Sequence, residues 1–315
     1  MSLLPAHIEA MRKWLASIDE VVVVDSESQD GTVEYLRHNL RHPRLRILSH
    51  PPGLYQSWNF GIAQCRAKYI YISTVGETMA ADGLPELFAT AERFTADVVI
   101  SPPRMVNERG RAQKKRWPIH KLLAQLRLSE PIALPPDLAQ LFVITFVQRG
   151  ILGSSASNLY RAEVLHRFPF RTDFGRAGDL AWGLEHAGEI TLAIVPRSFS
   201  TFLFHPKLYA RNEYSVGSIS SKCVPVARAV LEKNKRRGGD TQIELLLNEL
   251  LQAWEKYLER KRCVTEAKRP TFWWLAPGAW RAHRARHVAF NELSVLQRKA
   301  MLELAARVKH DPCPR

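Results

Sequence analysis

Residues 21–32 read VVVVDSESQDGT, and this segment sets the expectation for the rest of the chain. Four β-branched valines without polar alternation are typical of a strand that is buried on both faces of a parallel sheet. The run stops at a polar turn with a glycine and helix-capping residues, and a helical pattern resumes at Val33. We therefore predict a strand, a turn and a helix, with Asp25 at the carboxyl end of the strand.

On both sides of this segment, hydrophobic patterns of the helix type and the strand type alternate. We predict helices over residues 6–17, 55–65, 82–93 and 179–187, and strands over residues 45–48, 69–72, 97–101, 153–161, 190–195 and 199–204. This alternation predicts an α/β fold in which right-handed crossovers build a mostly parallel sheet with helices on both faces. Prolines interrupt residues 108–150, where we predict a loop-rich excursion over the sheet.

The 315-residue chain is 46% hydrophobic and 24% charged, a globular composition that excludes a disordered or collagen-like protein. Its longest apolar stretches fall well short of the roughly 20 residues of a membrane-spanning helix, and the N-terminus lacks a signal-peptide pattern. The four cysteines form no CxxC pair, so neither a zinc knuckle nor a disulfide framework is indicated. We expect a soluble, cytoplasmic protein.

Positive charge is concentrated in the last third of the chain. Residues 1–205 hold 23 lysines and arginines against 20 acidic residues, whereas residues 206–315 hold 22 against 11. We predict an enzyme-like domain over the first range and a basic helical region over the second. Long amphipathic patterns in the second range lie near residues 222–236, 241–262 and 288–309. Such a region either meets an anionic partner or presents a solvated helical face.

Several catalytic motifs are absent from the sequence. No GxGxxG follows a strand, and no GxxxxGK[ST] occurs, which excludes the usual dinucleotide-binding turn and the P-loop. Neither HExxH nor GxSxG is present. Carboxylates at strand ends therefore remain as the candidate chemistry.

Four segments follow one another in an order that is characteristic of one enzyme family. They are VVVVDSESQDGT (21–32), GLYQSWNFGI (53–62), YIYISTVGE (69–77) and RAGDLAWGLEHAG (176–188). In this order and spacing they resemble the family 2 glycosyltransferases, nucleotide-sugar-dependent enzymes of the GT-A fold. The resemblance covers about residues 20–205 and implies an inverting enzyme that transfers a sugar to a glycan or lipid-linked acceptor in surface polysaccharide assembly.

The resemblance also implies which residues bind the sugar donor. Asp25, Ser26 and Glu27 lie in the acidic turn that follows the family's strand, and Asn59 lies in its Asn-x-Gly-Ile segment. All four are expected to bind the nucleotide sugar. The alternative for Asp25 is a turn-forming aspartate without a ligand.

Asp179 is the expected catalytic base. The family's catalytic carboxylate begins a helix, and Asp179 holds the matching position. Glycosyl transfer needs a group that accepts the proton of the acceptor hydroxyl, and a helix N-terminus keeps a carboxylate ionised at neutral pH. The alternative is an N-cap aspartate with no chemical role.

A divalent cation, manganese or magnesium, is the cofactor that the resemblance implies. The family normally offers Asp-x-Asp after the third segment's strand, whereas this chain has a single acidic residue, Glu77. One carboxylate makes a poor site for either metal unless other ligands complete it. His205, at the end of a predicted strand, is a candidate for the missing ligand, although a structural histidine is the alternative.

The chain departs from the family at its beginning. Family members normally open with an additional apolar strand, whereas this chain opens on the helix before Val21. Without that strand, we expect an exposed sheet edge and a reduced donor pocket.

The basic region adds two expectations about partners. Residues 271–280 hold three tryptophans and precede an arginine and histidine cluster, a combination that suits an anionic membrane surface at the inner face. The alternative is a packing patch against the body. No nucleic-acid module is recognisable, so we expect no nucleic-acid partner. For the whole chain, the alternative to an enzyme is a non-catalytic, glycosyltransferase-like binding protein.

Overall fold

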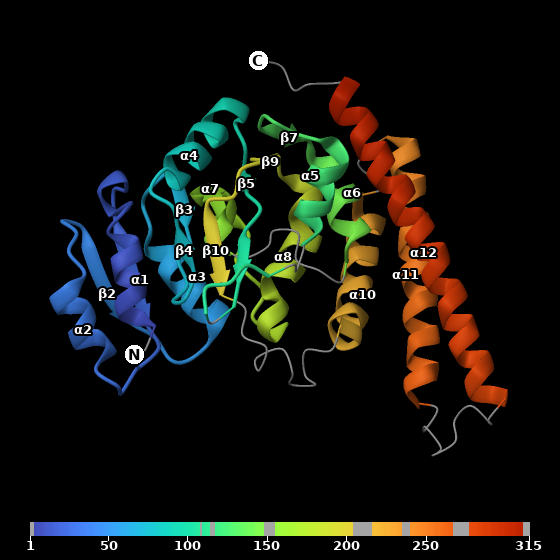
Figure 1. Ribbon diagram of the computed structural model, residues 1–315, viewed down its shortest axis with the longest axis horizontal. Helices are drawn as coiled ribbons and strands as arrows, with labels where there is room; N and C mark the ends of the chain where they lie inside the picture. Colours follow the sequence, from blue (N-terminus) through green and yellow to red (C-terminus); the bar gives the residue numbers. More distant parts are fainter. Residues whose placement is uncertain are drawn as a thin grey trace.

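The protein is an α/β structure with a helical C-terminal region, as Figure 1 shows for the computed structural model. The structure describes residues 3–107, 109–113, 117–147, 155–203, 216–234, 240–266 and 277–310. Helices pack on both faces of the largest sheet and enclose two hydrophobic clusters. The predicted α/β class is therefore confirmed.

The largest sheet has five strands, and its strand directions are mixed. In spatial order the strands are β3 (Tyr69–Tyr71), β8 (Asn158–Arg161), β5 (Val98–Ile100), β9 (Leu192–Ile194) and β7 (Ile132–Leu134). Only β5 and β9 are parallel neighbours, and the other three neighbouring pairs are antiparallel. The prediction of a mostly parallel sheet was wrong because central strands that are buried on both faces have the same apolar pattern in either direction.

Strands β1 (Val21–Asp25) and β2 (Leu45–Ser49) form a separate parallel pair. Val22, Val23 and Val24 are only half-buried, which corrects the prediction that both faces of this strand are covered. Among the residues that the structure describes, β2 is the single strand bonded to β1. The expected exposure of the other edge of β1 stays a prediction.

A third sheet has three short strands that come from separate parts of the chain. Their order is β4 (Thr78–Met79), β10 (Ser200–Leu203) and β6 (Arg104–Val106). Strand β10 is antiparallel to β4 and parallel to β6. Thr201 of β10 is paired with Thr78, the residue that follows Glu77. Strand β10 therefore runs beside the turn that contains Glu77.

Four helices and a short 3-10 turn cover the first hundred residues. They are α1 (Leu4–Met11), the 3-10 turn Leu15–Ser17, α2 (Thr32–Asn39), α3 (Leu54–Gln64) and α4 (Gly83–Phe94). Helix α1 packs with β1, α2 and α4 in the smaller hydrophobic cluster, to which it contributes Leu4, Ile8 and Met11. Helix α3 lies against β1 and carries the second segment of the family-like series.

The loop-rich excursion predicted for residues 108–150 is instead well structured where it is described. It holds α5 (Pro118–Leu126), β7 and α6 (Pro136–Thr145). Pro118 and Pro136 stand at the first helical position, where the missing N–H costs nothing. Residues 138–145 of α6 are all buried, so the helix has no polar face from which its period could be read.

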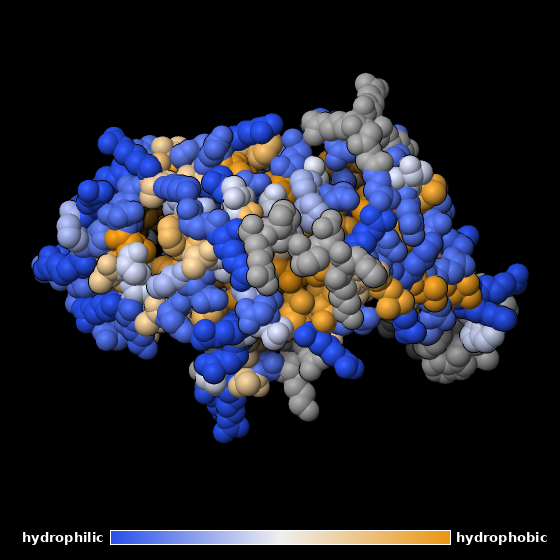
Figure 2. Space-filling model, turned by 90° about the horizontal axis from the view of Figure 1, so that it is seen from above, coloured by the Kyte–Doolittle hydropathy of each residue, from blue (hydrophilic) through white to orange (hydrophobic). Residues whose placement is uncertain are grey.

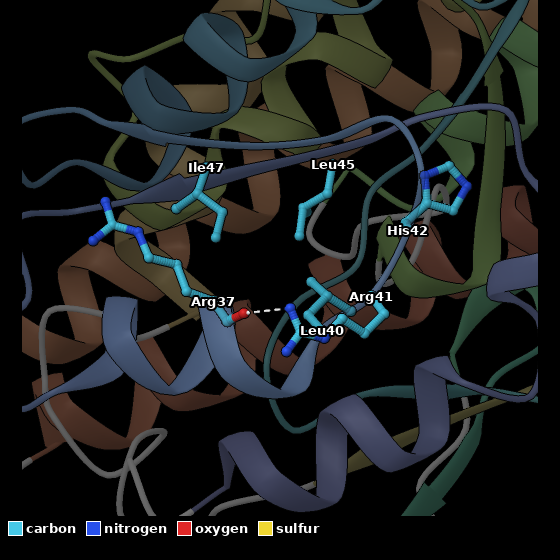
Figure 3. A pocket seen from close by; sticks show the side chains of 6 residues that line it. All are labelled: Arg37, Leu40, Arg41, His42, Leu45 and Ile47. Atoms are coloured by element: carbon cyan, nitrogen blue, oxygen red, sulfur yellow. Dashed lines mark hydrogen bonds between the residues drawn. The ribbon is translucent and has the colours of Figure 1, made fainter.

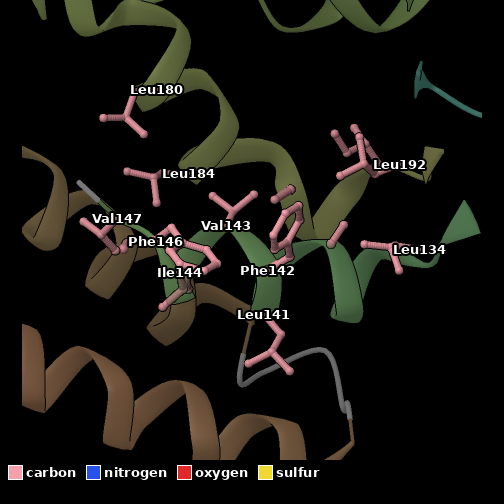
Figure 4. Packing of buried hydrophobic residues seen from close by; sticks show 14 of the residues in the cluster. Leu134, Leu141, Phe142, Val143, Ile144, Phe146, Val147, Leu180, Leu184 and Leu192 are labelled. Atoms are coloured by element: carbon pink, nitrogen blue, oxygen red, sulfur yellow. The ribbon is translucent and has the colours of Figure 1, made fainter. Parts of the chain in front are cut away.

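Helix α6 is the centre of the larger hydrophobic cluster. Figure 4 shows Phe142 and Val143 on the side of α6 toward α8 (Gly178–His186), while Leu141 points toward the C-terminal helices. Those helices are α10 (Val216–Asn234), α11 (Thr241–Glu266) and α12 (Pro277–His310), and α7 (Ala162–Arg167) precedes α8.

The C-terminal helices share this core with the sheet. Leu250 and Trp254 of α11 and Leu304 of α12 are buried in the same cluster as α6. The Trp254 indole Nε1 donates to the Ile144 carbonyl at 3.3 Å, and the Gln297 amide donates to the Thr145 carbonyl at 2.7 Å. A division of the chain near residue 205 stays a prediction. Within the described residues, no helix is both long enough and apolar enough to span a lipid bilayer.

Candidate active site

The turn after β1 is built around the Asp25 carboxylate. Asp25 is buried, and its Oδ2 accepts the Ser28 backbone N–H at 2.9 Å, which closes an Asx-type turn. Glu27, in the middle of this turn, has a positive φ of 59° and is exposed. The turn-forming role that was the alternative for Asp25 is therefore present, and its second oxygen has no hydrogen bond to the residues described.

Helix α3 joins this turn to Asp179. The Ser57 hydroxyl lies 3.1 Å from the Ser26 hydroxyl, and the Tyr55 hydroxyl donates to Asp179 Oδ1 at 2.8 Å. Tyr55 and Ser57 are two residues apart near the N-terminus of one helix. The structure thus brings two of the three predicted acidic positions to the same end of α3, although they are 154 residues apart in the chain.

Asp179 combines a dense environment with access to solvent. Part of the residue's surface is exposed to solvent, so Asp179 as a whole is only half-buried. Protein nevertheless surrounds the carboxyl group closely, and this burial raises the pKa of Asp179 above its ordinary value. Hydrogen bonds from Tyr55 and from the Leu180 backbone N–H act on this pKa in the opposite direction. A carboxylate with a raised pKa is a stronger base, which suits proton abstraction.

The approach of Tyr55 to Asp179 requires a glycine. A Cβ on Gly178 would overlap the Tyr55 ring and the Arg171 carbonyl. The Tyr55 ring also packs against Trp58 and Phe170, at centroid distances of 5.0 Å and 5.8 Å. The phenol is therefore fixed by aromatic packing on one side and by its hydrogen bond to Asp179 on the other.

Asn59 holds the backbone of Phe170. Its Nδ2 donates to the Phe170 carbonyl at 2.8 Å, and its Oδ1 accepts the Phe170 N–H at 2.9 Å. An amide has two N–H donors and two acceptor lone pairs, so these bonds use half of its capacity. The expected contact between Asn59 and the nucleotide sugar stays a prediction.

The turn that contains Glu77 is held by helix α1. The His7 Nδ1 lies 3.0 Å from the Glu77 carbonyl oxygen, and its Nε2 lies 3.2 Å from the Ser73 hydroxyl. Burial lowers the pKa of His7, so the neutral ring donates from Nδ1 and accepts at Nε2. Glu77 itself is half-buried and lies close enough to Tyr71 to help raise its pKa.

The described residues do not form a metal site. Glu77 is the single acidic residue of its turn, and no group of three histidine, cysteine or carboxylate side chains comes together in the described parts of the chain. The other candidate ligand, His205, lies outside them, as do the tryptophans of the 271–276 segment. A divalent cation therefore has no fitting donor set here, and no step of the chemistry below depends on one.

A separate hollow of about 340 Å³ lies at the opposite end of the β1–β2 pair (Figure 3). Arg37, Arg41 and His42 line it together with apolar residues of β2 and α2. Leu45, in its wall, is paired with Val21 at the start of β1, whereas Asp25 is at the other end of that strand. The hollow is therefore distinct from the site around Asp179.

Sequence patterns missed Tyr55, Ser57 and His7. Each acts through a residue that is far away in the chain. Tyr55 and Ser57 lie in the family-like segment 53–62, but the resemblance pointed to Asn59 there, and His7 lies outside all four segments. One signal was available: Gly178 immediately before Asp179 indicates that another group must approach this backbone closely.

Comparisons with known proteins bear on the family and the fold. The model of the family described as "Glycosyl transferase family 2" matches residues 2–152. No curated protein matches the chain by sequence.

Among solved structures, two of the similar ones are from S. aureus. The crystal structure of TarS 1-349 in complex with UDP-GlcNAc has a TM-score of 0.55 and 14% identity, over 96% of this chain and 86% of that one. A crystal structure of TarS has a TM-score of 0.54 and 13% identity, over 96% of this chain and 52% of that one. At these identities the similarity shows a shared fold, which is the expected GT-A-like one.

Proposed function

Because residues 2–152 belong to glycosyl transferase family 2, we propose that the chain is an inverting glycosyltransferase that uses a nucleotide-sugar donor. The acceptor is a glycan or a lipid-linked glycan in surface polysaccharide assembly. The fold shared with TarS, whose complex contains UDP-GlcNAc, supports a uridine diphosphate sugar as the first donor to test.

In this proposal Asp179 is the base. Its carboxylate takes the proton of the acceptor hydroxyl while that oxygen attacks the anomeric carbon, and the bond from this carbon to the diphosphate oxygen breaks. The nucleoside diphosphate leaves with the bonding electron pair. Because the acceptor oxygen attacks the face of the anomeric carbon opposite the diphosphate in a single displacement, the sugar changes its anomeric configuration. Tyr55 holds the carboxylate toward α3 during this step.

The turn of residues 25–28 is the proposed donor site. It lies at the carboxyl end of β1, where ligands bind in α/β sheets. The second Asp25 carboxylate oxygen can accept a hydrogen bond from the nucleobase or the ribose, and the exposed Glu27 and half-buried Ser26 flank it. Family 2 enzymes are expected to neutralise the diphosphate with a divalent cation. No residue of this chain is assigned as its ligand.

One observation carries this function above the others: Tyr55 and Ser57 of α3 connect Asp179 and the Asp25 turn by hydrogen bonds. A donor turn and a base that touch the same end of one helix are close enough to serve one substrate pair. Two unrelated turn aspartates would have no reason to share this support.

The test is an Asp179→Asn variant. We expect a loss of about 1,000-fold in release of UDP from UDP-GlcNAc, because general base catalysis contributes about 10²- to 10⁴-fold. The dissociation constant for UDP, measured by calorimetry, should change less than twofold. Asp173→Asn is the matched control, since Asp173 lies on the surface beside Arg171 and should retain full turnover. Full turnover by Asp179→Asn would refute its assignment as the base.

A non-catalytic binding protein is the second candidate, and the lack of an acidic cluster in the described residues favours it. This candidate predicts that UDP-sugars bind while no UDP is released, with or without Mn²⁺ and over a panel of donor sugars. Any turnover that Asp179→Asn abolishes would exclude it.

A further inference from the structure

The α11–α12 hairpin differs sharply between its two ends. Its root packs against the body through Trp254 and Gln297, which donate to carbonyls of the last two residues of α6. Its other end, which we call the hairpin tip, consists of residues 259–264 of α11 and 280–291 of α12. In Figure 1 the tip projects beyond α10 at the lower right.

Charge separates the two ends. At the root, cations are balanced by ion pairs between elements, including Lys299 with Glu249 at 3.0 Å and Lys256 with Glu292 at 2.6 Å. The tip holds six lysines and arginines against one acidic residue, Glu259. The six are Arg260, Lys261, Arg262, Arg281, Arg284 and Arg286. Burial and the nearby Arg286 lower the pKa of Lys261, which shows how closely these cations are placed.

Apolar side chains stand among these cations. Trp280, Val288 and Phe290 are each about half exposed, at 56%, 49% and 48%. The Arg284 guanidinium lies 5.9 Å from the centroid of the Trp280 ring. Figure 2 shows hydrophobic side chains in contact with solvent beside hydrophilic ones at the end of the molecule where α11 and α12 lie.

Packing within the hairpin accounts for only part of these residues. Ala289 is buried and the Phe290 ring lies 5.7 Å from the Tyr257 ring, yet Phe290 is still about half exposed. Leu293 is the first α12 residue in the large core, and the sixteen residues 277–292 extend about 24 Å of helix before it at 1.5 Å per residue. A solvated helical face explains the arginines but not the exposed Trp280 and the exposed half of Phe290 beside them. An anionic lipid surface explains both, because headgroups attract the cations while indole and phenyl rings settle at the interface.

We infer that the hairpin tip is a docking surface for an anionic lipid membrane. In Figure 1 the tip lies toward the same lower edge of the molecule to which strand β10 points. A membrane at this edge would lie on the side of the Glu77 turn, which is paired with β10 through Thr78. The tip is separate from Asp179, so docking and turnover can be measured independently.

The experiment uses the full chain and large unilamellar vesicles of phosphatidylcholine alone or with 30% phosphatidylglycerol. We expect sedimentation with the second kind of vesicle only. The triple variant Arg281→Glu, Arg284→Glu, Arg286→Glu should bind at least about 100-fold more weakly, since each basic side chain near such a surface contributes about 1 kcal/mol. Trp280→Ala with Phe290→Ala should weaken binding severalfold.

The matched control is Arg37→Glu, Arg41→Glu, Arg44→Glu, which changes net charge by the same amount on exposed residues far from the tip. It should keep most of the vesicle binding. Equal losses in the two triple variants would mean that overall charge alone drives binding, and would overturn the proposal. So would equal binding to both kinds of vesicle, or vesicle binding that the tip variants leave unchanged.

Further measurements distinguish a lipid from a nucleic-acid partner and check that the variants fold. A 20-base-pair DNA duplex serves as the other polyanion, and tip-dependent binding to the duplex without vesicle binding would assign the tip to nucleic acid instead. Circular dichroism melting checks folding, and glutamine at the same three positions replaces glutamate if the first variant is unstable. Release of UDP from UDP-GlcNAc without vesicles should be unchanged in the tip variants, so failure of the docking proposal is distinguishable from failure of the proposed function.

Discussion

The β1–β2 pair and the core around α8 support the two halves of the candidate site in different ways. β1 has one strand partner among the described residues and half-buried valines, and it ends in an exposed turn. Helix α8, in contrast, has Leu180, Trp182 and Leu184 in the large core and keeps Asp179 within dense protein. The proposed donor turn therefore follows a strand that is only half-buried, whereas the proposed base lies in densely packed surroundings that disfavour its charge.

The largest expected effect concerns His186, at the C-terminal end of α8, where burial also disfavours the charged form of a side chain. Burial lowers the pKa of His186 to about 4, and its Nδ1 has no hydrogen bond in the described residues. A ring that is harder to protonate in the folded state stabilises the fold above pH 6.5, and this stability is lost as the pH falls toward 4. We expect His186 to account for a loss of about 3 kcal/mol in the free energy of unfolding over that range.

His186→Phe isolates this effect, because a phenyl ring retains the stack on Phe168, whose ring centroid is 4.0 Å away. Urea unfolding between pH 7 and pH 4 should show a shallower decline for the variant than for the wild type. The charged groups that surround the ring are the same in both proteins: Glu185, Glu189, Arg167 and Lys233. Parallel curves for the two proteins would show that α8 tolerates charge.

The second effect compares β1 with β5, because the same valine-to-alanine substitution can be made in each strand. Val99 of β5 is fully buried and Val23 of β1 is half-buried, and both belong to the smaller hydrophobic cluster. We expect Val99→Ala to lower the free energy of unfolding by about 2 to 3 kcal/mol and Val23→Ala by about 1 kcal/mol. Denaturant unfolding measures both. Equal losses would contradict the inference that β1 contributes less buried apolar surface than β5.

The smallest effect distinguishes the two contacts that α3 makes, from Tyr55 to Asp179 and from Ser57 to Ser26. In Tyr55→Phe the carboxylate loses a donor, so the pKa of Asp179 rises further and the acidic limb of the kcat/KM profile moves to higher pH. Turnover at pH 6 should fall about tenfold, the equivalent of one weakened charged hydrogen bond.

Ser57→Ala is the control for this variant, because Ser57 contacts the donor turn through Ser26 and not Asp179. It should raise KM for the donor slightly and leave the pH profile in place. A shifted profile in Ser57→Ala, or an unshifted one in Tyr55→Phe, would show that α3 does not divide its contacts in this way.

Much of the fold followed from hydrophobic period. The strand ending at Asp25 and the helices beginning near Leu54 and Gly178 lie where the sequence pattern placed them. The misses have physical causes: α6 is buried on all sides, and α12 begins at Pro277 rather than near 288, because alanines and arginines form helix without an apolar stripe. Strand direction left no trace in the pattern.

The site was less predictable than the fold. The positions of Asp25 and Asp179 at element ends could be read from local sequence, but their common support could not, since the Tyr55 contact spans 124 residues. Local sequence also gave no sign that the Asn59 amide holds the backbone of Phe170, and its expected contact with the sugar donor stays a prediction. Glu77 and His205 as metal ligands stay predictions.

The contacts of α3 also constrain how this chain can vary in length. Tyr55 and Ser57 face Asp179 and Ser26 from fixed positions on one helix, in which each residue advances the side-chain direction by about 100°. A single inserted or deleted residue between them would turn one contact away while keeping the other. Insertions should therefore accumulate before Gly53 or after Gln64 in related sequences, and the single residue between Tyr55 and Ser57 should be neither lost nor duplicated.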